Sequence, residues 1–75
     1  MIERKGTQIC EQCKYSYDWV AIFRTEGEFN FGPIKDLHGK NIKFCGLNNG
    51  RLIATSICPN CGIVQIKNVV DEPLP

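Results

Sequence analysis

Two cysteine pairs impose the strongest constraint on how this chain can fold. Cys10 and Cys13 form one C-x-x-C pair, Cys58 and Cys61 form a second, and 44 residues lie between the pairs. A C-x-x-C turn directs two sulfur atoms to one side, and two such turns facing each other supply the four corners of the tetrahedron that Zn²⁺ prefers. The spacing therefore predicts a metal site made of Cys10, Cys13, Cys58 and Cys61.

The chemistry of the surrounding sequence favours a metal over disulfide bonds. The start, "MIERKGTQ", is charged and lacks the apolar segment of a signal peptide. The longest apolar runs, such as "WVAIF", are too short to span a bilayer. We therefore expect a cytoplasmic protein without membrane contact, in a compartment where thiols stay reduced. Five cysteines also cannot all pair within one chain.

The length of 75 residues limits the chain to one domain. Chains this short bury a small fraction of their surface and commonly depend on a cross-link or a metal. We predict a flexible, charged lead-in over residues 1–6, a single domain over residues 7–70 and a tail over residues 71–75. An insertion in that domain is predicted at about residues 26–51, because glycines and a proline interrupt the strand pattern there.

Apolar periodicity predicts short strands and no helix. Residues 15–25 alternate between two faces, and "NNG" between residues 42–47 and 51–57 is a hairpin signal. Further short strands are predicted over residues 7–10, at Phe29–Phe31 and over residues 63–70. The predicted fold class is a small all-β domain, stabilised by a metal, with an antiparallel sheet and two cysteine-bearing turns.

The segment "CPNCG" opposite another C-x-x-C resembles the zinc-ribbon domains. In that group two cysteine-bearing hairpin turns, called knuckles, hold one zinc ion beside a small antiparallel sheet. The resemblance implies that Cys10, Cys13, Cys58 and Cys61 bind one structural Zn²⁺. It does not cover residues 24–51, and it narrows the function little, because zinc ribbons serve transcription, translation, RNA processing and protein assembly.

The segment "CEQCKYSYD" also resembles the first knuckle of rubredoxins, with Tyr15, Tyr17 and Asp18 at matching places. A tetrahedral four-sulfur site suits iron as well as zinc, so an iron electron-transfer protein is an alternative. Lys14 stands where that family has glycine, the 44-residue separation is too long, and the strongly acidic composition of rubredoxins is missing.

Other candidate residues have simpler explanations. Cys45 has two possible functional roles, as a spare ligand or as a reactive thiol. We favour the interpretation that it is a small buried side chain on a strand. His38 lies in the polar loop "DLHGK" and is expected to be solvated. One face of the 15–25 strand is either a base-stacking platform or, as we favour, core. That face carries Tyr15, Tyr17, Trp19, Ala21 and Phe23.

The predicted function is protein interaction rather than catalysis. A four-cysteine site has no open coordination position for hydrolysis, no small-molecule substrate is evident, and a thioredoxin-like role needs a βαβ context that is missing here. A protein partner is expected to contact the insertion, where Phe29 and Phe31 are either exposed or packed on the sheet. Nucleic-acid binding is an alternative supported only by Lys35, Lys40, Lys43 and Arg51, since the formal net charge is +1.

Overall fold

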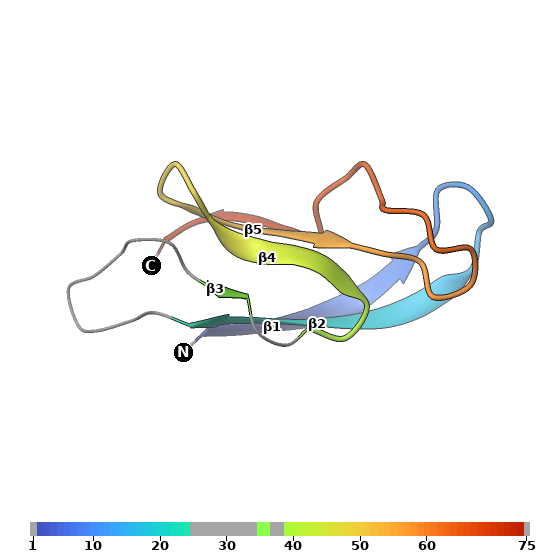
Figure 1. Ribbon diagram of the computed structural model, residues 1–75, viewed down its shortest axis with the longest axis horizontal. Helices are drawn as coiled ribbons and strands as arrows, with labels where there is room; N and C mark the ends of the chain where they lie inside the picture. Colours follow the sequence, from blue (N-terminus) through green and yellow to red (C-terminus); the bar gives the residue numbers. More distant parts are fainter. Residues whose placement is uncertain (1, 25–34, 37–38, 75) are drawn as a thin grey trace.

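Two three-stranded antiparallel sheets face each other in a computed structural model, which describes residues 2–24, 35–36 and 39–74. The first sheet has the order β1-β2-β3 and the second the order β4-β5-β6 (Figure 1). The strands are β1 (Ile2–Ile9), β2 (Ser16–Arg24), β3 (Lys35–Asp36), β4 (Ile42–Asn48), β5 (Arg51–Ser56) and β6 (Val70–Pro73). The predicted all-β class is confirmed, with two sheets, and the described residues contain no helix that could cross a membrane.

The first hairpin joins β1 and β2, and its turn carries the first cysteine pair. The register runs from Ile2 opposite Phe23 to Ile9 opposite Ser16. Residues 2–6 are therefore strand, so the predicted flexible lead-in is wrong. The sequence did not predict this strand, because the inward face of β1 includes the polar side chains of Arg4 and Gln8 in place of an apolar row.

The second hairpin confirms the signal in "NNG". Strands β4 and β5 meet at Asn49 and Gly50, whose φ angles of 51° and 75° are both positive, as a type I′ turn requires. This turn matches the right-handed twist of the strands it connects. Residues 42–50, predicted to belong to an insertion, therefore build an edge strand and turn of the second sheet.

The end of the chain differs from the prediction. Residues 63–70 were expected to form the last strand, but pairing there is limited to a single bridge between Ile57 and Val64, and β6 begins at Val70. Residues 71–73, predicted as a tail, belong to β6 and pair with β5. Pro73 is tolerated because β6 is an edge strand, where a missing N–H interrupts no ladder.

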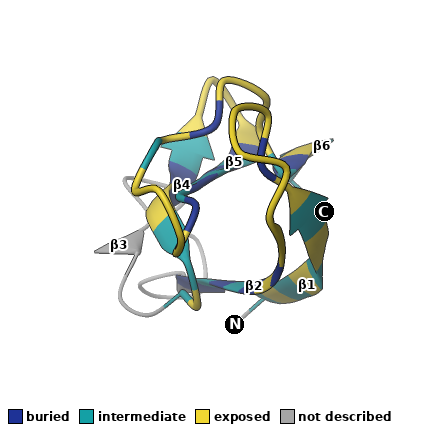
Figure 2. Ribbon diagram, turned by 90° about the vertical axis from the view of Figure 1, so that its right-hand side faces the viewer, coloured by how far each residue is buried: buried dark blue, intermediate teal, exposed yellow. Residues whose placement is uncertain are grey.

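The core lies between the two sheets, where β2 packs against β4 and β5. Viewed from one end, the buried residues line the inner faces of both sheets (Figure 2). Phe23 and Leu52 are the largest fully buried side chains. The whole buried cluster is Trp19, Ala21, Phe23, Cys45, Leu52, Ala54 and Val70. The interpretation of the 15–25 strand face as core is thus confirmed from Tyr17 onward, whereas Tyr15 is exposed.

We expect Leu52→Ala to lower the free energy of unfolding of the metal-loaded protein by about 2–5 kcal/mol, because it opens a cavity in a core with few large side chains. Urea denaturation followed by circular dichroism measures this change. Ile66→Ala is the matched control, since the Ile66 side chain is 92% exposed, and its effect should stay within about 0.5 kcal/mol. Equal losses in the two variants would contradict the assigned core.

Candidate metal centre

Each cysteine pair lies in a turn with the same backbone hydrogen bonds. In the first turn, the N–H of Cys10 donates to Tyr15 O over 2.9 Å and the N–H of Lys14 donates to Cys10 O over 3.0 Å. In the second, the N–H of Cys58 donates to Ile63 O over 3.0 Å and the N–H of Gly62 donates to Cys58 O over 2.9 Å. We call these turns the first knuckle (residues 10–15) and the second knuckle (residues 58–63).

The residue after the second cysteine takes a left-handed conformation in both knuckles. Its φ is 63° at Lys14 and 78° at Gly62. Glycine adopts this conformation without steric cost, whereas a side chain brings Cβ close to the following carbonyl. Lys14 therefore holds a strained backbone, and its ammonium group donates to Glu11 O over 3.3 Å.

The knuckles bring four sulfur atoms together at one end of the molecule, the right-hand end in Figure 1. All four lie within 4.8 Å of one another, and the distances Cys10–Cys61 and Cys13–Cys58 are both 3.6 Å. A tetrahedral ion with metal–sulfur bonds of about 2.3 Å requires sulfurs about 3.8 Å apart. The four cysteines predicted from the spacing thus have the arrangement of a group that could hold one metal ion.

Backbone amides favour thiolates at this site. The N–H groups of Cys13 and Gln12 each lie 3.4 Å from Cys10 Sγ, and they lower the pKa of the Cys10 thiol to about 6. At Cys61 the N–H of Ile63 acts in the same direction, but desolvation and the three neighbouring sulfurs outweigh it and raise the pKa to about 12. Four adjacent thiols cannot all ionise unaided, because like charges repel. A cation bound among them removes this obstacle, so the donor set fits a divalent metal.

Side-chain amides from the second knuckle region support the sulfurs of the first. The side chain of Asn60 donates to Cys13 Sγ over 3.5 Å, which lowers the pKa of that thiol. Gln65 is only 2% exposed, and its Nε2 donates to Cys10 Sγ over 3.5 Å and to Ile63 O over 3.1 Å. Its Oε1 accepts the N–H of Glu11 over 2.8 Å. Gln65 therefore links both knuckles through one buried amide.

Sequence reasoning missed Gln65. It lies in the segment predicted as the last strand, flanked by Val64 and Ile66, and a single polar residue there suggests an outward position. Instead the chain bends after the bridge at Val64, and the Gln65 N–H donates to Ser56 O over 2.9 Å. The sequence feature that could have indicated Gln65 is its position as a polar residue four places after the last cysteine. Its contacts, however, form only once the two knuckles meet.

A buried pair of hydroxyl groups lies beneath the sulfurs. Tyr17 packs with Cys10 and Cys58 in a small cluster, and its hydroxyl shares a 2.8 Å hydrogen bond with the Ser56 hydroxyl. Tyr17 is 6% exposed and Ser56 is fully buried. Because Tyr17 lies on β2 and Ser56 on β5, this bond joins the two sheets directly below the site.

The remaining candidates lie elsewhere. Cys45 is 1% exposed on β4, outside the four-sulfur group, and its thiol lies 3.5 Å from Ile22 O, which confirms the interpretation as a small buried side chain. Trp19 is 7% exposed and Phe23 fully buried, so neither ring is available as a stacking platform. Phe29, Phe31 and His38 lie outside the described residues.

Comparison of the chain with models of protein families, with curated proteins and with solved structures finds no match. The class rests on geometry: a small all-β protein with a four-cysteine cluster that could hold a metal ion, which is consistent with a zinc-ribbon-like fold.

Lys14→Gly should raise the free energy of unfolding of the metal-loaded protein by about 1 kcal/mol, because glycine relieves the left-handed strain. Gly62→Ala, which introduces that strain at the equivalent place, should lower it by about the same amount. Thermal or urea denaturation measures both. A Lys14→Gly protein that is less stable than the parent would contradict the equivalence of the two knuckles.

Gln65→Leu should weaken metal binding by about 10- to 100-fold, as removal of a hydrogen-bonding partner of the ligands typically does. The variant leaves the Glu11 N–H without its acceptor and Cys10 Sγ without one donor. Competition with a chromophoric chelator measures the affinity. Gln12→Leu is the control, because Gln12 is exposed and contributes its backbone N–H. Equal affinities of the two variants would show that the Gln65 amide is unimportant.

Proposed function

We propose that this chain is a zinc-ribbon-like module in which Cys10, Cys13, Cys58 and Cys61 bind one structural Zn²⁺. The observation that carries the proposal is the convergence of four sulfurs from two hairpin turns within 4.8 Å. Zinc favours closed tetrahedral thiolate sites of this kind and contributes directly to folding. Because four cysteines leave no ligand position open, the metal supplies no catalysis and the protein is not an enzyme. Thiolate ligands persist in a reducing compartment, which favours the cytoplasm.

Iron is the alternative metal, because a tetrahedral four-sulfur set suits it as well. The N–H groups directed at Cys10 and Cys58 in both knuckles are hydrogen bonds that would tune the potential of such a centre. Zinc remains the preferred assignment because Lys14 and the long separation of the pairs depart from the rubredoxin pattern. An iron-loaded protein would be red, with sulfur-to-iron absorption.

The activity that we propose is the binding of another protein. A closed structural site directs attention to the surface, and Phe29 and Phe31 of the insertion are candidate contacts outside the described residues. Nucleic-acid binding is the less favoured alternative, because the net charge is +1 and the large rings of β2 are buried. A steep decrease of oligonucleotide affinity with salt would support that alternative.

Metal removal tests the structural role. Protein purified from its own host should contain one zinc per chain, and a strong chelator should abolish both the metal and the native far-ultraviolet spectrum, because binding and folding are coupled. Cys58→Ser should behave like the stripped protein, whereas Cys45→Ser should retain one zinc, since Cys45 lies outside the four-sulfur group. A metal-free protein that keeps the native spectrum would disprove the structural role.

A further inference from the structure

Strand β1 is an edge strand whose backbone groups alternate between β2 and open space. Val20 exchanges both of its backbone hydrogen bonds with Lys40, over 3.1 and 2.8 Å, so these groups of Val20 point away from β1. Lys5 is the register partner of Val20 and Thr7 that of Asp18. In an antiparallel pair such residues alternate with hydrogen-bonded ones. The N–H and C=O groups of Glu3, Lys5, Thr7 and Ile9 therefore point to the outer edge.

Side chains of the same strand occupy one carbonyl group at each end of this edge. Arg4 Nη1 donates to Glu3 O over 3.0 Å, and Gln8 Nε2 donates to Ile9 O over 3.3 Å. Arg4 is held in place by Glu72 of β6, with a distance of 2.7 Å between Arg4 Nε and Glu72 Oε1. Among the described residues, the outward N–H and C=O groups of Lys5 and Thr7 have no hydrogen-bond partner.

The uncovered part of the edge opens onto a hollow. The hollow measures about 400 Å³ and is lined by Thr7, Gln8 and Ile9 of β1, by Trp19 of β2 and by residues 67–69. Strands β1 and β6 lie on the same side of the molecule (Figure 2), and this hollow lies between β1 and the segment leading into β6. An incoming chain could thus place alternate side chains in the hollow while its backbone faced β1.

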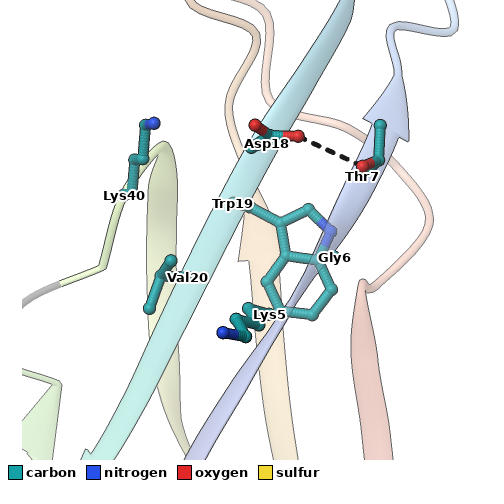
Figure 3. Close-up of a pocket in the computed structure, with 7 residues that line it drawn as sticks. All are labelled: Lys5, Gly6, Thr7, Asp18, Trp19, Val20 and Lys40. Carbon is teal, nitrogen blue, oxygen red and sulfur yellow. Dashed lines mark hydrogen bonds between the residues drawn. The ribbon is translucent and has the colours of Figure 1, made fainter.

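Side chains of β2 contact the exposed part of β1. Figure 3 shows the indole of Trp19 against Gly6, where an added Cβ would lie 3.0 Å from the ring, and the hydroxyl of Thr7 bonded to Asp18 over 3.1 Å. These contacts join β1 to β2 on both sides of the Thr7 amide. An edge joined in this way loses less freedom on binding, which favours association.

We propose that the β1 edge from Lys5 to Ile9 binds an extended acidic peptide, which adds as a fourth strand to the first sheet. Regularly alternating donors and acceptors along an edge match an extended backbone. Lys5 and Lys40 line the outer surface beside the edge together with one acid, Asp18, whose carboxylate accepts the Thr7 hydroxyl, and Lys67 lines the hollow. Lysines therefore outnumber acids among the residues that line these two spaces. The partner therefore alternates acidic side chains, beside Lys5, with aliphatic side chains that enter the hollow.

This inference rests on the proposed interaction role and assigns it a site other than the insertion. A second copy of the chain is the less favoured occupant, because pairing two β1 edges would gather Lys5 and Lys67 of both copies. Lysines on an edge strand commonly oppose such pairing.

The test uses the zinc-loaded protein, labelled with ¹⁵N, and the capped peptide Glu-Val-Glu-Val-Glu-Val. The amide resonances of Lys5 and Thr7 should shift most on titration. A peptide with lysine in place of glutamate should bind at least about tenfold more weakly, which corresponds to about 1.4 kcal/mol. Lys5→Glu should weaken binding of the acidic peptide, while Lys43→Glu, on the exposed part of β4, should leave it nearly unchanged.

Backbone methylation separates strand addition from simple charge attraction. Methyl groups on alternate peptide nitrogens fall either toward β1 or away from it. One of the two methylated peptides should therefore lose at least about tenfold in affinity and the other should bind almost as well as the parent. Equal effects of the two methylation patterns, or no binding at all, would overturn the proposal.

Self-association provides a further outcome. If sedimentation shows a dimer of the unliganded protein that is lost in Thr7→Pro, which removes an outward N–H of the edge, a second copy occupies the edge and the proposal is wrong. The zinc content and the dispersion of the spectrum are recorded before peptide is added. A failure of peptide binding by folded, zinc-loaded protein therefore overturns the edge site and leaves the structural role of the metal intact.

Discussion

The four-sulfur site is the interaction on which the rest of the structure depends, because it joins the two sheets at one end. The first knuckle is the turn between β1 and β2, and the second follows β5, so one ion bound by both would tie the first hairpin to the second sheet. The core between the sheets is thin, with Phe23 and Leu52 as its largest fully buried side chains. A domain of this size gains little from burial alone, which makes such a cross-link important.

Three polar contacts also connect the two halves of the structure. Gln65 links the knuckles, the Tyr17–Ser56 hydrogen bond joins the sheets beneath them, and Arg4 pairs with Glu72 between β1 and β6. The first two are buried, so their loss would leave unsatisfied groups in a low-dielectric region. The Arg4–Glu72 ion pair is partly exposed and contributes less to stability. The hydrogen bond from Arg4 lowers the pKa of Glu72.

The four-sulfur site, which we propose to stabilise the fold, is separate from the edge that we propose to bind a partner. The four sulfurs are engaged with one another and with amides, so the protein binding that we propose depends on surfaces elsewhere. The β1 edge combines an exposed backbone, a neighbouring hollow and an excess of lysines over acids, whereas one carbonyl group at each end is occupied by a side chain of its own strand. Such partial cover limits strand addition to a short segment and reduces uncontrolled edge-to-edge association.

The sequence by itself determined the ligand candidates, the fold class and the "NNG" hairpin, because these depend on local spacing, alternation and the positive φ that Asn and Gly tolerate. It also indicated the core face of β2 through every second residue. Only the tertiary structure decided that residues 2–6 and 71–73 are edge strands, since these polar segments are extended through backbone pairing with β2 and β5. It likewise decided the role of Gln65, whose partners are 54 and 55 residues away and adjoin it only after both knuckles come together.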